Sequence, residues 1–389
     1  MSLLRVAPAE TVRGEGAVEA MAARLAARVR RAGGEGPVLL VHGEVGYPVV
    51  RARLDAALDG RDVAVARALH RGPCHQDAID AVAGAASEAN AAWLLGVGGG
   101  RVLDVAKGAA YASDARVAVL PTSPATCAAT APTVVVYDVH GGHLEAREGG
   151  PSADLVALDP EILAAVPDRL LASGIVDAWA KVHEVRLTSG RAADRSASAR
   201  AALALLEDLA ELLEARGEAA IGAGPEGAGG AGPSHDRRVV AEAVVSYPGL
   251  VGGLAGADAK LALAHPLHDA LTRVPGSHGA LHGEKVGFGS LVQMLLAGRD
   301  GVGTTLSERR AAMRDEAARY ARLGFACHLE ALGCGALREP EWANRAIEQT
   351  LADPSVRQAF PALGAEELAV AIATVDADVR ELVGADPVP

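Results

Sequence analysis

The feature that most constrains how this chain folds is a change of hydrophobic pattern near Pro167. Upstream of it, continuous apolar runs such as 37–43 and 91–100 alternate with segments of helical spacing such as 76–89. Downstream of it, helical spacing continues without such runs. Continuous apolar strands that alternate with helices are typical of a parallel sheet with both faces covered. The sequence therefore predicts an α/β domain with a parallel sheet over 1–166 and an all-α domain over 167–389.

The same patterns place the individual elements. A helix over 16–33 is expected to precede the first strand, and a Gly, Ala and Pro-rich segment, 217–236, is predicted to be a flexible loop because it cannot bury an apolar face. Strands are expected at 37–43, 62–69, 91–100 and 115–123, followed by a hairpin around 140–142 and a short strand within 153–160. Further helices are expected at 168–190, 194–216, 237–253, 255–273, 282–298, 306–333, 341–353 and 365–384.

Length and charge exclude several classes of protein. A chain of 389 residues exceeds what one hydrophobic core usually organises, in agreement with two domains. The 37 Lys and Arg against 49 Asp and Glu give a net charge of −12 without a basic run, so no nucleic acid partner is expected. No run approaches the roughly 18 apolar residues of a membrane span, and the N-terminus lacks an apolar signal core, so we expect a cytoplasmic protein without membrane contact.

The spacing of the four cysteines indicates the redox state of the compartment. Cys74, Cys127, Cys327 and Cys334 form no CxxC pair. This spacing fits a reducing compartment, and it argues against both a disulfide framework and a thiolate zinc site.

A glycine-rich turn follows the strand expected at 91–100. Gly98, Gly99 and Gly100 stand between this strand and a segment of helical spacing that begins at Arg101. Glycines let a backbone approach an anion closely, and the amino end of a helix holds negative charge, so this turn is suited to a pyrophosphate. The turn matches neither GxGxxG nor the GK[ST] loop of NTPases, and a tight turn without a ligand is the alternative.

A second loop suited to phosphate follows the next strand. Residues 121–126 read PTSPAT, which places hydroxyl groups at the carboxyl end of a parallel strand, the edge where such sheets bind ligands. Two such loops on successive strands favour a dinucleotide, although Ser and Thr also cap backbone locally.

Histidines cluster in the second half of the chain. His265, His268, His278 and His282 fall within 18 residues, although the whole chain has only 12 histidines. His265 and His268 lie near one face of a helix, and Pro275-Gly276 can turn the chain so that His278 or His282 returns toward them. The spacing indicates a Zn²⁺ or Fe²⁺ site with one open position, and histidines without a metal are the alternative.

A third ligand is expected from an acidic residue of the helical domain. Asp177 lies in the otherwise apolar stretch GIVDAWAK, where a carboxylate must be paired or must bind a cation. The alternative is an ion pair with Lys181, one helical turn later.

Four segments occur together in the order and approximate spacing of a known superfamily. They read GVGGGRVLDVAK (96–107), PTSPATCAATAPTVVVY (121–137), GIVDAWAKVHE (174–184) and AHPLHDALTRVPGSHGALHGEKVGFG (264–289). In these segments the chain resembles the iron-containing alcohol dehydrogenase and glycerol dehydrogenase superfamily, whose fold is dehydroquinate-synthase-like. Within it, the TCAA segment and the AK after Asp177 are most similar to the hydroxycarboxylate dehydrogenase branch.

The resemblance implies a set of site residues. It implies that Asp177, His265 and His282 bind one divalent metal, and that the protein is a homo-oligomer acting on a small-molecule substrate. It also implies that the nicotinamide cofactor, NAD or NADP, is lined by Gly98, Gly99, Gly100, Asp104, Thr122, Ser123, Thr126 and Tyr137.

Three positions depart from the superfamily's pattern. Cys127 stands where glycerol dehydrogenases have an Asp that binds polyol hydroxyls, which makes glycerol a poor candidate substrate. Lys181 replaces the second His of iron-selective members, which favours zinc or loose metal selectivity. Gly43 closes the first apolar strand where NAD users often have an Asp, which leaves NADP(H) open.

These observations lead to one expected reaction. We expect metal-assisted hydride transfer between NAD(P) and a small alcohol or 2-hydroxy acid, with His268 as proton relay and His278 at the mouth of the site. Lys181 and Cys127 are expected to contact the substrate, Lys181 through an anionic group. The alternatives are a dehydroquinate-synthase-type cyclase or lyase that uses hydride transfer transiently, and a metal-free binding module of the same fold.

Overall fold

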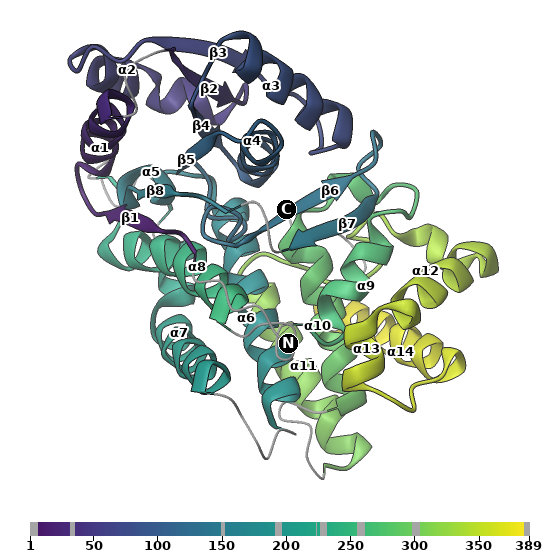
Figure 1. Cartoon of the computed structure of the whole chain (residues 1–389). Coiled ribbons are helices and arrows are strands. Elements are labelled where there is room, and N and C mark those ends of the chain that lie inside the picture. Colours follow the sequence, from purple (N-terminus) through teal and green to yellow (C-terminus); the bar gives the residue numbers. More distant parts are fainter. Residues whose placement is uncertain are drawn as a thin grey trace. The chain divides into compact units, whose positions relative to one another are not determined.

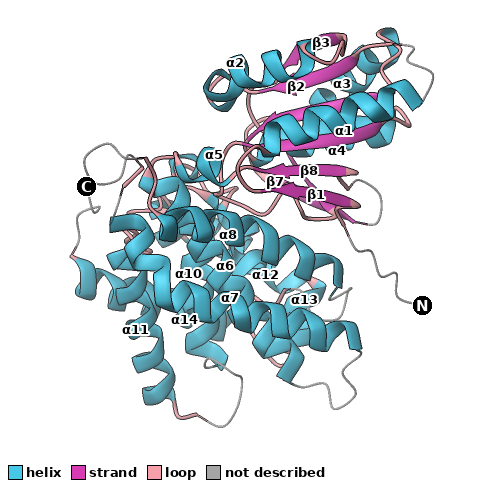
Figure 2. Ribbon diagram, turned by 90° about the vertical axis from the view of Figure 1, so that its left-hand side faces the viewer, coloured by secondary structure: helices cyan, strands magenta, loops and turns pink. Residues whose placement is uncertain are grey.

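The chain forms two compact units. The computed structural model describes residues 7–31, 36–148, 152–190, 197–222, 224–225, 232–254, 261–297 and 304–384. The first unit comprises residues 3–171 and 222–253, and the second comprises 172–221 and 254–389. The first unit is built on a parallel sheet and the second on helices, which confirms the predicted fold class (Figures 1 and 2).

The first unit is organised by a six-stranded sheet of order β1-β8-β5-β4-β2-β3, with all neighbours parallel. One strand was not predicted, because the short, alternating β1 pairs only with β8 at the sheet edge and carries no apolar run. The strands are β1 (Glu10–Arg13), β2 (Val38–His42), β3 (Val65–Leu69), β4 (Trp93–Gly98), β5 (Arg116–Pro121) and β8 (Leu155–Leu158).

Helices cover both faces of this sheet, as the continuous apolar strands require. The helices are α1 (Ala17–Arg31), α2 (Gly46–Asp59), α3 (Gln76–Glu88), α4 (Gly100–Ala112) and α5 (Pro160–Ala164). Alternate strand residues such as Leu40 and Leu95 join α1 and α2 in one core, and α1 lies along the strands in Figure 2. On the other face, Gly96 lies against Ala106 and Leu103 of α4.

A separate antiparallel pair extends from the first unit. Strands β6 (Thr133–Tyr137) and β7 (His143–Glu148) form the predicted hairpin, with Gly141 at φ +92° in the connecting turn. Alternate residues of β6 such as Val134 and Val136 are buried, as expected for a strand with one face on a core.

The second unit contains helices whose lengths differ in places from those predicted. They are α6 (Asp168–Gly190), α7 (Ala197–Gly222), α9 (Ala264–Leu271), α10 (His282–Ala297), α11 (Leu306–Arg322), α12 (Pro340–Ala352), α13 (Pro354–Ala359) and α14 (Ala365–Val383), and α6 begins within the first unit. The helix predicted over 306–333 ends early because Gly324 takes a left-handed conformation (φ +90°). Of the helix predicted over 255–273, residues 255–260 lie outside the described residues and α9 begins at Ala264.

The structure differs from two predicted ranges, the all-α domain over 167–389 and the loop over 217–236. Helix α8 (His235–Leu254) groups with the first unit although it follows α7 in sequence. Its buried Arg237 donates to the carbonyl of Ala164 (2.7 Å), and its Val245 carbonyl accepts from Thr130 Oγ1 (2.5 Å). Helical periodicity shows that α8 has a buried face but not which core covers it.

The predicted loop 217–236 is shorter in the structure, because α7 continues to Gly222 and α8 begins at His235. Much of the segment between these helices lies outside the described residues.

Two observations concern the predictions on membrane spans and on disulfides. Among the described residues, no helix combines the length and hydropathy that a membrane span requires. All four cysteines are buried and unbridged.

Candidate metal and dinucleotide sites

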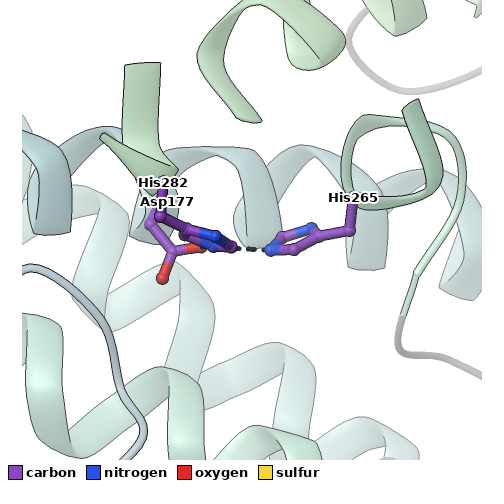
Figure 3. Close-up of side chains that lie close together, drawn as sticks. All are labelled: Asp177, His265 and His282. Atoms are coloured by element: carbon purple, nitrogen blue, oxygen red, sulfur yellow. Dashed lines mark hydrogen bonds and ion pairs between the residues drawn. The ribbon is translucent and has the colours of Figure 1, made fainter. Parts of the chain in front are cut away.

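Three helices of the second unit bring together the three residues predicted to bind a metal. Asp177 comes from the middle of α6, His265 from the start of α9, and His282 is the first residue of α10. Nε2 of His265 lies 3.1 Å from Asp177 Oδ1, and Nε2 of His282 lies 3.3 Å from the same oxygen. In Figure 3 the ring of His265 faces the side chains of His282 and Asp177, which overlap in this view. Potential ligand atoms of all three lie within 4.8 Å of one another.

Small residues allow the three helices to approach this closely. A Cβ at Gly283 would lie 2.1 Å from the Ser173 carbonyl oxygen of α6, and one at Gly289 would lie 2.4 Å from the Ala264 carbonyl oxygen of α9. Any larger residue at these positions would push α10 away. The sequence HGEKVGFG therefore holds His282 beside α6 and α9 by close backbone packing.

Glu184 orients His265 and was not predicted as a site residue. It lies two turns after Asp177 on the same face of α6 and is fully buried. Its Oε2 accepts from His265 Nδ1 (2.5 Å), and its Oε1 accepts from the backbone N–H groups of Ala262 (3.0 Å) and His265 (3.1 Å). Glu184 thus satisfies donors at the start of α9 and directs Nε2 of His265 toward Asp177.

A second chain of hydrogen bonds orients His282. His268 Nδ1 lies 2.9 Å from the Asp269 carboxyl and His268 Nε2 lies 3.0 Å from His282 Nδ1, so both rings are held in place by hydrogen bonds. This arrangement leaves Nε2 of His282 on the side of Asp177. The proton relay expected of the buried His268 stays a prediction, and the geometry supports a positioning role for it.

Lys181 also reaches this cluster. Its ammonium pairs with Asp177 Oδ1 and lies 3.3 Å from His265 Nε2. The ion pair considered as the alternative partner for Asp177 is therefore present, in company with two imidazoles.

The electrostatics of the cluster favour positive charge. Burial opposes ionisation of Asp177, but Lys181 and His282 outweigh it and hold the pKa of this carboxyl well below its usual range. Burial likewise opposes the imidazolium of His265, yet the Glu184 and Asp177 carboxylates raise its pKa to about 9. The buried carboxylates therefore draw a proton to His265 and the ammonium of Lys181 to the point that a dication would occupy, whereas burial lowers the pKa of His282.

The donor set fits a divalent cation. It offers one carboxylate oxygen and two imidazole nitrogens, each imidazole held through its other nitrogen, as is usual for metal-binding histidines. The side chain of His282 is 25% exposed, so the cluster is open to solvent on its side.

Replacing Glu184 by Gln is expected to weaken metal binding by about 10- to 100-fold. The amide has only one acceptor oxygen for the three donors that Glu184 satisfies. Metal affinity, measured by competition with a chelator, checks this. Glu207→Gln is the control, because Glu207 also pairs with a residue of α6, Arg186, away from the cluster; equal affinity for wild type and Glu184→Gln would contradict the role of Glu184.

The predicted phosphate-binding turn joins β4 to α4 in the first unit. Gly99 caps α4, and its Cβ position is open, with Ser123 Cβ as its nearest neighbour at 3.9 Å. Gly98 and Gly100 are constrained by the fold instead, since added Cβ atoms would lie 2.9 Å from Val102 and from Thr126 Oγ1. At Gly99, therefore, no side chain covers the backbone at the amino end of α4, and an anion could approach it closely.

The other predicted cofactor residues of the first unit fall into two groups. Thr122 lies against Gly46, Thr126 lies against Gly100, and the Ser123 hydroxyl accepts from the Ala125 N–H (3.3 Å), so this loop borders the turn. Asp104 is different, because it is buried, lies 2.9 Å from Lys107 Nζ and accepts from the Val135 N–H (3.3 Å). Burial raises its pKa, which the nearby ammonium only partly offsets.

The remaining predicted residues are placed as follows. Gly43 follows β2, and Tyr137 ends β6 with its ring against His143. Cys127 is nearly buried in the loop after β5, and its carbonyl accepts from the Thr130 N–H (3.0 Å). His278 is exposed on a short 3-10 turn and is not among the three clustered residues.

Comparisons with known proteins agree with this architecture. Residues 8–160 match the family model of iron-containing alcohol dehydrogenases. A crystal structure of a probable glycerol dehydrogenase from Sinorhizobium meliloti is similar with a TM-score of 0.79 and 26% identity, over 96% of this chain and 98% of that one.

Two curated proteins are similar in sequence. The glycerol dehydrogenase of Escherichia coli O6:H1 is 36% identical over 58% of this chain, and hydroxycarboxylate dehydrogenase A of Escherichia coli K12 is 30% identical over 60% of it. The matches span 60% and 63% of the lengths of these two relatives.

Proposed function

We propose that the chain belongs to the iron-containing alcohol dehydrogenase superfamily, which the family-model match over 8–160 and the similar glycerol dehydrogenases support. We propose further that it catalyses metal-assisted hydride transfer between NAD(P) and a small alcohol or 2-hydroxy acid and its carbonyl compound. The observation that carries the proposal is that Nε2 of His265 and Nε2 of His282 both lie beside Oδ1 of the buried Asp177. The relatives named as glycerol dehydrogenase and hydroxycarboxylate dehydrogenase support the same class of reaction.

Each residue of the cluster has a part in this proposal. Asp177, His265 and His282 would hold the metal, while Glu184 and His268 fix the two imidazole rings. When bound, the metal would polarise the carbonyl oxygen of the substrate or lower the pKa of the alcohol. Lys181 stands in place of a fourth ligand, which would be a third imidazole, and this supports zinc, or loose selectivity between zinc and iron.

Lys181 supports a class of substrate. In the structure its ammonium lies at the Asp177 oxygen that a metal would take. A dication would displace this ammonium by charge repulsion, and a displaced ammonium in a largely apolar setting requires another anion. We therefore propose that Lys181 exchanges Asp177 for the carboxylate of a 2-oxo or 2-hydroxy acid. Cys127, where polyol-binding relatives have Asp, is consistent with an acid in preference to glycerol.

The proposal is tested by following NADH and NADPH at 340 nm with purified protein, added zinc or iron, and a panel of 2-oxo acids, aldehydes and ketones. Both cofactors are included because Gly43 presents no carboxylate to oppose a 2′-phosphate. Steady oxidation that depends on metal is expected. Transient reduction with release of a rearranged product would indicate the cyclase alternative, and dinucleotide binding without any turnover would indicate a binding module.

Substitution of Gly99 by Val is expected to weaken dinucleotide binding while the fold persists. The added side chain enters the open backbone approach at the amino end of α4, where the pyrophosphate is proposed to lie, and meets no close protein atom at its Cβ. Dissociation constants for NADH from fluorescence titration measure the effect. Gly84→Val is the matched control, since Gly84 in α3 also has open space; an unchanged constant in Gly99→Val would exclude this turn as the phosphate site.

A further inference from the structure

Lys107 is a fully buried cation of the first unit, and the reaction proposed above does not use it. It lies on α4, two turns after the glycine-rich turn, and its side chain has no exposed surface. Its ammonium donates to the carbonyl oxygens of Ala128 (2.8 Å), Ala131 (3.3 Å) and Thr133 (2.6 Å). These carbonyls belong to the loop after β5 and to the start of β6.

Asp104 completes this arrangement from the preceding turn of α4. Its carboxylate lies 2.9 Å from Lys107 Nζ, and its other oxygen accepts from the Val135 N–H of β6. Lys107 thus binds backbone carbonyls and Asp104 a backbone N–H of the same neighbouring segment. Because a buried charge without partners is costly, all these contacts must form together.

The segment held in this way contains the residues proposed to contact the cofactor. Thr126 precedes the first tethered carbonyl by two residues, and its hydroxyl lies against Gly100 of the turn. The far end of the loop is held by α8, because Thr130 Oγ1 donates to the Val245 carbonyl and packs directly against Gly249. The loop is therefore clamped between α4 and α8, both within the first unit.

We propose that Lys107 and Asp104 are positioning residues that hold the loop over 122–132 against the glycine-rich turn, so that two separate phosphate-binding segments act as one dinucleotide site. In this proposal Asp104, which the resemblance places in the lining of the cofactor site, acts on the loop through Lys107 and the Val135 N–H instead. This inference rests on the dinucleotide binding proposed above and assigns to this pair the task of pre-forming the site.

The test compares Lys107→Met and Asp104→Asn with wild type at a temperature well below unfolding. Methionine fills similar space but leaves the three carbonyls without a donor, and asparagine retains an acceptor for Val135 while removing the negative charge. The dissociation constant for NADH is expected to rise at least tenfold in Lys107→Met and less in Asp104→Asn. Metal affinity is expected to be unchanged, and backbone amides of 123–131 are expected to exchange faster with deuterium.

Lys285→Met is the matched control. Lys285 is also a buried lysine that donates to backbone carbonyls, those of Ser277 (2.9 Å) and Ala280 (2.8 Å), but it belongs to the second unit. Its loss is expected to lower the unfolding temperature without changing the NADH dissociation constant. If wild type binds NADH and both Asp104→Asn and a folded Lys107→Met bind it equally well, the positioning role is wrong while the proposed function stands. If wild type binds neither NADH nor NADPH, the proposed function itself fails.

Discussion

His282→Ala is expected to lower metal affinity by more than about 100-fold and to reduce turnover by a similar or larger factor. Asp177 Oδ1 is shared by two imidazoles, and loss of one leaves only two protein donors for the metal. Dinucleotide affinity is expected to persist, because the predicted phosphate-binding turn belongs to the other unit. Metal content after chelation and dialysis, followed by titration with zinc, measures the effect.

His278→Ala is the control for this experiment. His278 belongs to the same run of histidines but is exposed on the turn before α10. The His278→Ala variant is expected to bind metal with the affinity of the wild type. Wild-type metal content and activity in His282→Ala would show that the cluster is not a metal site.

Lys181→Met is expected to separate acidic from neutral substrates. If the ammonium binds the substrate carboxylate, its loss removes a charged hydrogen bond worth about 1.5–3 kcal/mol, which is roughly a 10- to 150-fold increase in KM for 2-oxo acids. Neutral aldehydes of similar size are expected to change little. Metal affinity is expected to increase, because Lys181 no longer competes for Asp177.

The two measurements give distinct outcomes. Equal losses for acids and aldehydes would show that Lys181 supports the fold and does not recognise the substrate. A weaker metal affinity in Lys181→Met would contradict the exchange of Asp177 between ammonium and metal.

The sequence alone determined the class of fold and the place of the glycine-rich turn at 98–100. Strands that are buried on both faces must be continuously apolar, and this local property is enough to identify β2, β4 and β5 from their residues. The edge strand β1 escaped prediction because its alternating residues are only half covered. Likewise, the spacing of apolar residues revealed α8 as a helix but did not show that it packs with the first unit.

The candidate metal ligands could be named from motifs, whereas the residues that hold them could not. Asp177, His265 and His282 stand in segments of distinctive composition, so resemblance to a superfamily was enough to select them. Glu184 and Lys107 are ordinary residues of helical segments, and their roles depend on which carbonyl, imidazole or N–H group the fold brings within 3.3 Å. Those partners lie 21 to 81 residues away in the chain. Only the tertiary structure decides such contacts, because burial makes a charged side chain choose its partners by proximity in space and not by spacing in sequence.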